Sequence, residues 1–169
     1  MRQGCTVSSL ELHPAWEFFA DTVMGGVSTG RVSQESIAGR SATRLTGEVS
    51  LENNGGFIQM AFDINADGSD FDGSAYHGLQ IDVLGNDDVY DLRLRTSELT
   101  RPWQSYRASF KAASDWSTVK LAFTDFAPHK TKVPFDARHL RRIGVLGIGR
   151  VFDADVAISS VRFLATGDW

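Results

Sequence analysis

Apolar side chains recur at every second position through much of this chain. The clearest run is Tyr90, Leu92 and Leu94, which alternates with polar residues. A period of two places successive side chains on opposite faces of a strand, whereas an amphipathic helix has a period of 3.6. The same alternation predicts strands, each with one buried and one wet face, at 57–64, 79–83, 90–95, 106–110, 119–123, 142–148 and 156–163.

Turn residues separate these strands. The sequence Gly-Asn-Asp-Asp at 85–88 predicts a hairpin between the strands at 79–83 and 90–95, and 99–102 forms the next turn. Only 136–141 favours a helix, and a short one. Many short strands with almost no helix indicate an all-β protein, a single-domain β-sandwich of the jelly-roll type. We assign residues 1–15 to an N-terminal lead-in, 16–165 to the β-sandwich domain and 166–169 to a C-terminal tail.

Composition argues against nucleic acid as a partner and against a membrane span. The 169 residues carry a formal charge of −4, without the clustered Lys and Arg of nucleic-acid binders. No run approaches the roughly 20 apolar residues of a membrane span. A single cysteine, Cys5, cannot form an internal disulfide, so we expect a reducing, cytoplasmic location. Neither nucleic acid nor a membrane span is expected.

Two glycine pairs mark sharp turns. Glycine tolerates positive φ and close backbone approach, so we interpret both as tight turns, with an anion-binding backbone nest as the alternative. The motif positions are Asp21, Met24, Gly25, Gly26 and Ser28 in the first turn and Asn54, Gly55, Gly56 and Phe57 in the second.

An acidic stretch resembles the first half of a calcium loop. Its carboxylate and amide positions are Asp63, Asn65, Asp67, Asp70 and Asp72. Position twelve of the loop is Ser74, where an EF-hand requires a bidentate glutamate. We therefore favour a solvated acidic loop and keep calcium as the weaker alternative; no cofactor and no other metal is predicted.

The wet face of the strand at 90–95 is the candidate binding surface. Alternation points Arg93 and Arg95 outward, and Arg107 lies near them if the next strand pairs with this one. Asp82, from the predicted hairpin partner, would offset part of the charge. This face is either a salt-bridged polar surface or an arginine-lined site for a carboxylate, a phosphate or an acidic partner. Trp103 follows Arg-Pro at a loop tip and is the tryptophan best placed to contact a ligand.

Catalysis finds little support. Ser28, His77 and an aspartate could form a triad, but no nucleophile elbow surrounds any serine. No catalytic residue is predicted.

The motifs in their order resemble the complex I intermediate-associated protein family. The matching positions include the two glycine turns, His77-Gly78-Leu79, the run from Tyr90 to Arg95, the run from Tyr106 to Phe110, and Trp116 followed by Phe123 and Phe126. The resemblance implies a galactose-binding-like β-sandwich, and the family's best-known members assist assembly of the respiratory NADH:ubiquinone oxidoreductase. We therefore expect a non-catalytic binding or assembly-factor-like domain that contacts another protein. A carbohydrate-binding module is the alternative, and an uncharacterised enzyme is the third.

Overall fold

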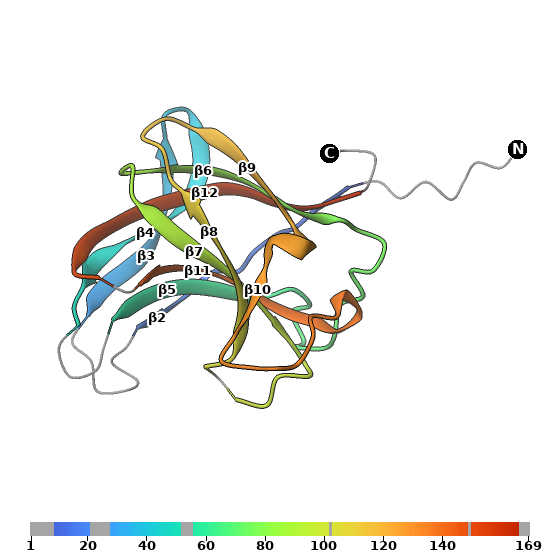
Figure 1. Ribbon diagram of the computed structural model, residues 1–169. Coiled ribbons are helices and arrows are strands. Elements are labelled where there is room, and N and C mark those ends of the chain that lie inside the picture. Colours follow the sequence, from blue (N-terminus) through green and yellow to red (C-terminus); the bar gives the residue numbers. More distant parts are fainter. Residues whose placement is uncertain (1–8, 21–27, 52–55, 102, 149, 166–169) are drawn as a thin grey trace, which may run out of the picture.

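Two antiparallel sheets packed face to face form the protein. The computed structural model describes residues 9–20, 28–51, 56–101, 103–148 and 150–165. Each sheet has six strands, and the sheets lie one above the other in Figure 1, with β12 in the upper and β5 in the lower. The predicted all-β sandwich is confirmed.

The upper sheet, here called sheet A, has the order β3-β4-β12-β6-β9, with β1 also paired to β12. Its strands are β1 (Leu10–Glu11), β3 (Thr29–Ile37), β4 (Arg40–Val49), β6 (Gly78–Gly85), β9 (Ser117–Ala122) and β12 (Phe152–Leu164). Sheet B has the order β10-β8-β7-β11-β5-β2. Its strands are β2 (Glu17–Ala20), β5 (Phe57–Asp63), β7 (Val89–Thr96), β8 (Ser105–Lys111), β10 (Ala127–His129) and β11 (Leu140–Ile148).

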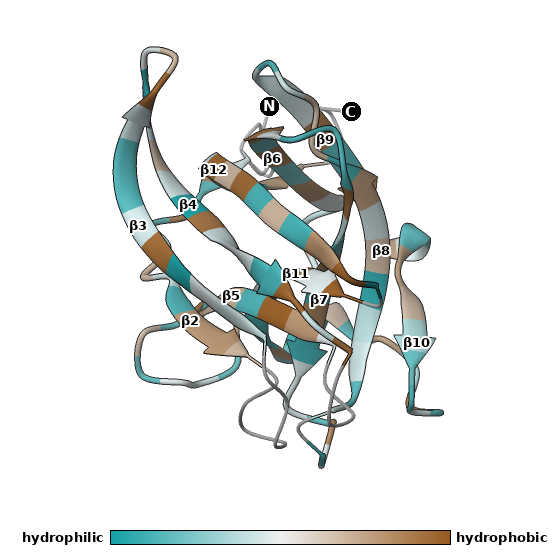
Figure 2. Cartoon of the chain, turned by 90° about the vertical axis from the view of Figure 1, so that its left-hand side faces the viewer, coloured by the Kyte–Doolittle hydropathy of each residue, from teal (hydrophilic) through white to brown (hydrophobic). Residues whose placement is uncertain are grey.

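The core fills the space between the sheets with the apolar half of each alternating strand. Tyr90, Leu92 and Leu94 are at most 1% exposed, as their pattern predicts. Each such side chain contributes about 1.5–3 kcal/mol of burial free energy. Figure 2 shows the alternation along β12 as bands of teal and brown.

The Tyr90 hydroxyl ties the two sheets together. It donates a hydrogen bond to Asn86 Oδ1 at 2.7 Å and accepts one from the backbone N–H of Asp155, on β12, at 2.8 Å. Burial raises the pKa of this phenol to about 12, so it stays protonated and can serve as both donor and acceptor.

The predicted hairpin at 85–88 is wrong. β6 belongs to sheet A and β7 to sheet B, so this turn carries the chain from one sheet to the other. The turn bonds instead to the chain just after β8, where Asp87 N donates to Ala112 O at 2.8 Å. Alternation identifies the buried face of a strand but does not identify the strand beside it.

Alternation also missed five strands: β1, β2, β3, β4 and β10. β3 is an edge strand with a largely polar sequence, and only Val32 and Ile37 are apolar. On β4 the inward positions Leu45 and Val49 are separated by Gly47, where a Cβ atom would lie 2.1 Å from Thr29 O. A glycine imposed by a close backbone approach thus interrupted the period-two signal.

Helix is confined to single turns among the described residues. The segment expected at 136–141 is the 3-10 turn η4 (Ala137–His139), and the strand expected to reach 123 ends at Ala122, before the turn η3 (Phe123–Asp125). In the described part of the chain no helix is long and apolar enough to cross a membrane.

Candidate functional site

The side of sheet B that points away from the core is the candidate site, here called the outer face of sheet B. Strand register places Arg107 opposite Arg93, and Arg93 opposite Gly144 on β11. Gly144 in turn lies opposite Ala61 on β5. The next row, through Leu92 and Val145, faces the core. The predicted pairing of Arg93 with Arg107 is therefore confirmed.

Two of these arginines share one carboxylate. Arg93 donates to Asp91 Oδ2 from Nη2 at 2.9 Å and from Nε at 3.3 Å, while Arg107 Nη1 lies 4.0 Å from the same oxygen. Arg93 Nη1 also approaches Ser105 Oγ at 3.5 Å. The Arg93 and Asp91 side chains are 10% and 15% exposed, whereas Arg107 is 49% exposed. Arg93 and Asp91 form the fixed base of the patch, and Arg107 presents its charge to solvent.

Arg95 supports the neighbouring loop. Its Nη1 donates to the carbonyl oxygens of Arg101 and Gln104 at 3.0 and 2.9 Å, which ties the loop after β7 to the end of the outer face. Trp103, on this loop, is 55% exposed, and the Arg101 guanidinium lies 5.9 Å from its ring centroid. The predicted exposed tryptophan therefore borders the outer face.

Positive potential dominates this part of the face. Burial, followed by the charges of Arg142 and Arg141, lowers the pKa of Arg95. Burial also lowers the pKa of His129, on β10, and Arg93 and Arg107 lower it further. Arg93 and Arg107 thus bring two positive charges to the single carboxylate of Asp91.

Asp82 does not belong to this site, which corrects the sequence-based expectation. It lies on β6 in sheet A, where its carboxylate accepts a hydrogen bond from Thr118 at 2.9 Å and pairs with Arg40 at 3.5 Å. The error follows from the mistaken hairpin, because a strand in the other sheet directs its polar side chains to the opposite side of the molecule. Asp82 cannot offset the charge of the outer face of sheet B.

Arg142 and Gln59 form the other half of the face, and neither was predicted from the sequence. Arg142, on β11, pairs with Asp63 at 3.1 Å and lies 4.9 Å from the Phe19 ring centroid. Beside it, the Gln59 side chain covers Gly144, where a Cβ atom would meet Gln59 Nε2 at 2.4 Å. The strand predicted at 142–148 begins at Arg142, two positions before Gly144, so its register already carried the signal that places Arg142 on this face.

The structure describes only part of each glycine turn. Asp21, Met24, Gly25, Gly26, Asn54 and Gly55 lie outside the described residues. Gly56 has the positive φ expected of it, +143°, and Phe57 begins β5. Ser28 is buried, and its hydroxyl accepts from Ser50 N at 2.8 Å.

Ser28 and His77 cannot form a triad. Ser50, the partner of Ser28, follows Val49, which is paired with Phe152 at the start of β12. His77 N donates to Leu164 O at the other end of this 13-residue strand. The two side chains are therefore separated by on the order of 40 Å, the length of such a strand.

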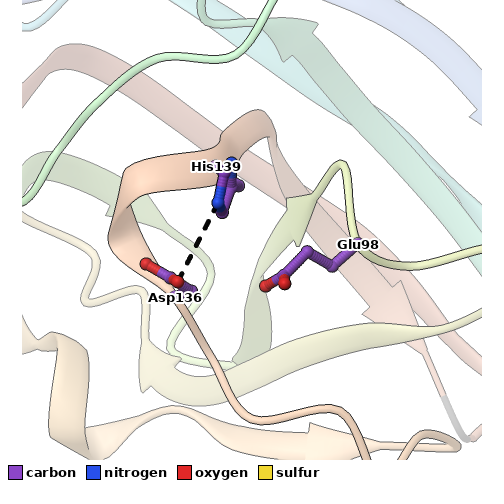
Figure 3. A group of neighbouring side chains, drawn as sticks. All are labelled: Glu98, Asp136 and His139. Carbon is purple, nitrogen blue, oxygen red and sulfur yellow. Dashed lines mark ion pairs between the residues drawn. The ribbon is translucent and has the colours of Figure 1, made fainter.

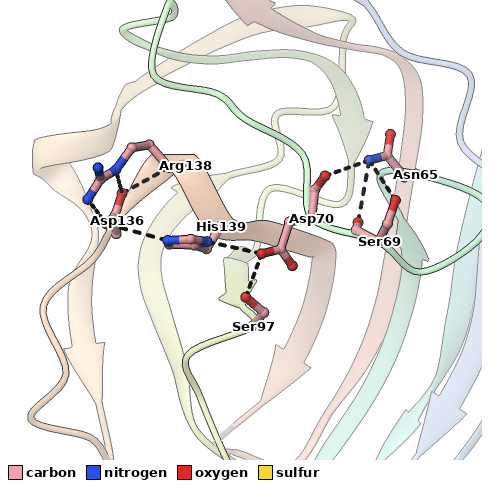
Figure 4. Close-up of polar contacts among 7 residues, drawn as sticks. All are labelled: Asn65, Ser69, Asp70, Ser97, Asp136, Arg138 and His139. Carbon is pink, nitrogen blue, oxygen red and sulfur yellow. Dashed lines mark hydrogen bonds and ion pairs between the residues drawn. The ribbon is translucent and has the colours of Figure 1, made fainter.

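The acidic stretch distributes its carboxylates among separate partners. Asp63 pairs with Arg142, while Asp67 and Asp72 each accept hydrogen bonds from the backbone N–H and hydroxyl two residues later. Asn65 donates to Asp70 O at 2.9 Å (Figure 4). These side-chain contacts cap turns, and the carboxylates do not converge as a calcium site requires.

Asp70 instead belongs to a histidine cluster. Its Oδ2 lies 3.0 Å from His139 Nδ1 and accepts from Ser97 Oγ at 2.8 Å (Figure 4). The other ring nitrogen faces Asp136, at 4.0 Å, with Glu98 nearby (Figure 3). The Asp70 hydrogen bond raises the pKa of His139, and His139 in turn lowers that of Asp70.

Glu98, Asp136 and His139 are the described residues best placed to hold a metal ion, since their ligand atoms all lie within 4.8 Å of one another. Arg138 competes for this role, because it donates to both carboxylate oxygens of Asp136 at 3.0 and 2.8 Å. Ion pairing already balances much of the charge that would attract a cation.

Known structures share this fold. A family 11 carbohydrate-binding module from Clostridium thermocellum, solved with a β-1,3-1,4-mixed-linked tetrasaccharide, has a TM-score of 0.75 and 10% identity, covering 94% of this chain and 96% of its own. The family 30 module of a cellulosomal cellulase from the same organism has a TM-score of 0.69 and 13% identity, covering 95% and 99%. An exo-β-agarase matches over 91% of this chain and 23% of its own, with a TM-score of 0.60 and 12% identity. These likenesses show the fold: a jelly-roll β-sandwich, which this chain shares with carbohydrate-binding modules.

Sequence comparison identifies the family. Residues 5–155 match complex I intermediate-associated protein 30, so the chain belongs to that family. No curated protein matches the sequence. The resemblance noted from the motifs is confirmed.

Proposed function

We propose that this protein is a non-catalytic binding domain that acts through contacts with another protein, in the manner of an assembly factor. The outer face of sheet B is the contact surface, and an acidic patch of the partner is the group it binds. Membership of the complex I intermediate-associated protein 30 family supports the protein-contact proposal.

One observation carries the choice of surface: Arg93 and Arg107 share the single carboxylate of Asp91. Positive charge therefore exceeds negative charge on adjacent strands, and like charges there repel unless an anion lies between them. A carboxylate from a partner would relieve that repulsion. The planar guanidinium of Arg107, half-exposed, is suited to a bidentate contact with it.

Capture from the native cell extract tests this proposal. Arg107→Glu should abolish recovery of the partner at physiological salt without lowering the melting temperature, because Arg107 contributes only a weak surface ion pair. Arg31→Glu is the matched control, since Arg31 is an exposed arginine on β3 of the opposite sheet. Recovery should also fall as salt rises. Equal recovery by the wild type and Arg107→Glu would refute the proposed surface.

Carbohydrate binding is the second candidate. It is favoured by the likeness to carbohydrate-binding modules and by the exposure of Trp103 beside the outer face. Sugar sites combine aromatic rings with paired polar groups. Trp103→Ala would then reduce binding of a β-glucan and leave the protein partner unaffected, which distinguishes the two candidates. An enzyme is the third candidate, and the separation of Ser28 from His77 removes the triad considered for it.

A further inference from the structure

A cavity of about 160 Å³ lies beside β12 in sheet A, at the point where the strand paired with β12 changes from β4 to β1. β4 pairs with β12 as far as the Thr43–Ile158 position. On the same side of β12, β1 begins to pair only at Glu11–Arg162. Between these positions a bulge at Ser159 shifts the register with β6. The gap left between β4 and β1 forms the cavity.

Neutral hydrogen-bonding side chains line this cavity. Gln34, Ser41, Thr43 and Ser159 all contribute to its wall. Thr43 is only 6% exposed and lies on the inward side of β4, opposite Ile158. Hydroxyl and amide groups on a cavity wall can each donate and accept hydrogen bonds, so this lining is suited to a polar ligand or to water.

The charge of the cavity wall is compensated. Glu11 is the charged residue of the lining, and its Oε1 accepts from Arg162 at 3.0 Å. Its Oε2 accepts a hydrogen bond from Ser160 Oγ at 2.8 Å. The carboxylate remains an acceptor without a net charge that would select a cation, so the cavity favours a neutral polar ligand.

Trp16 adds an aromatic surface. The indole is half-buried in the cavity wall and held edge-to-face against Phe62, with ring centroids 4.7 Å apart. An aromatic ring packs on the C–H groups of a sugar while neighbouring polar groups bond its hydroxyls. No other aromatic residue lines the cavity among the described residues.

We propose that this cavity binds one neutral pyranose ring, at a site separate from the outer face of sheet B. Its volume corresponds to about five water molecules, enough for a single ring whose far side remains open to solvent. So small a ligand should bind in the millimolar range. This proposal does not depend on the protein-contact function, because it uses different residues on the other sheet.

Chemical-shift mapping on the folded protein tests it. D-glucose and D-galactose are titrated into ¹⁵N-labelled protein, with D-glucuronate as the charged comparison. We expect at least one neutral sugar to shift the Trp16 indole N–H and the Ser159 and Ser160 amides in a saturable way. Glucuronate should bind more weakly, because its carboxylate would lose hydration in a cavity whose wall offers it no uncompensated positive charge.

Two variants establish the site. Thr43→Val keeps the side-chain volume and removes a hydroxyl from the cavity wall, so it should weaken binding about five- to tenfold. Gln34→Ala, at an exposed position of β3, is the second variant and should also weaken binding. Val151→Ala, at a 71% exposed position outside the cavity lining, is the control and should leave binding unchanged.

Three results would overturn the proposal. The first is the absence of saturable shifts at Trp16 with both neutral sugars, and the second is binding that survives in both Thr43→Val and Gln34→Ala. The third is a set of shifts centred on Trp103, which would place sugar binding on the outer face of sheet B instead.

Discussion

The two wet faces of the sandwich arise from the same alternation, yet they balance charge differently. On sheet A, Arg44 donates to both carboxylate oxygens of Asp155 at 2.8 and 2.6 Å and to Glu35 at 3.2 Å. Arg162 and Arg40 on that side have acidic partners of their own, at 3.0 and 3.5 Å. On sheet B, Arg93 and Arg107 share Asp91.

This contrast shows that an arginine-rich strand is not evidence of a binding face on its own. On sheet A, Arg44 has two carboxylate partners, Asp155 and Glu35, so its charge is neutralised within the protein and the contact is structural. On sheet B, Arg93 and Arg107 have one carboxylate between them, and this is the basis for the contact surface that we propose there. The following changes test how far the contrast extends, beginning with the largest expected effect.

Replacing Arg93 should destabilise the fold most. Its guanidinium is largely buried against Asp91, so Arg93→Ala loses packing and leaves that carboxylate with the distant Arg107. We expect a loss of about 2–3 kcal/mol in the free energy of unfolding, measured by urea denaturation. Arg107→Ala, the control on the same face, should cost less than about 0.5 kcal/mol. Equal losses of unfolding free energy in the two variants would contradict the structural role that separates Arg93 from Arg107.

Replacing Arg44 should have an intermediate effect. Hydrogen bonding to Asp155 raises the pKa of this arginine, and Arg44→Ala leaves Asp155 and Glu35 as uncompensated like charges. Because the group is about one-third exposed, we expect a loss of only about 1 kcal/mol, smaller at high salt. Partner capture should not change. A loss of capture would show that sheet A also contacts the partner.

The pKa values of two histidines are shifted in opposite directions. His129, beside the arginines of sheet B, has a lowered pKa, whereas His139, beside Asp70, has a raised one. His139 therefore stabilises the fold below about pH 6.5 and loses this contribution as pH rises through its folded pKa. For His129 stability falls as pH drops below about 6.5, because the unfolded chain binds the proton more readily.

NMR titration of the two ring resonances measures both shifts. His139→Gln should remove the loss of melting temperature on the alkaline side, and His129→Gln should reduce the loss on the acid side. Two histidines titrating at the same pH would contradict the difference in potential between their surroundings.

Calcium should have the smallest effect. Asp63, Asp67, Asp70 and Asp72 already bind arginine, histidine or their own turns. We therefore expect the same melting temperature in excess EDTA and in millimolar calcium. Ligand binding to the native state stabilises by RT ln(1 + [L]/Kd), so a large rise would reveal a site that the side-chain contacts do not suggest.

Part of the candidate site was predictable because alternation is local. The run from Tyr90 to Arg95 identified its own buried and wet positions, and the neighbouring run supplied Arg107 opposite Arg93. The prediction assigned Asp82 to the wrong sheet, because the turn residues at 85–88 suit either a hairpin within one sheet or a crossing between the two sheets. Gly144 and Gln59 were missed because their role depends on contact between β11 and β5, strands far apart in the sequence.

The sequence by itself determined the fold class, the family and the face of each alternating strand that is buried. Those features depend on local periodicity and on the burial of apolar surface, which each segment encodes in its own residues. Tertiary structure alone decided which strands are neighbours. That choice makes Asp91 the carboxylate shared by two arginines, moves Asp82 to the opposite sheet, and opens a cavity where β12 leaves β4 before it meets β1. Strand neighbours are set by long-range packing of the whole sandwich, which no single stretch of sequence encodes.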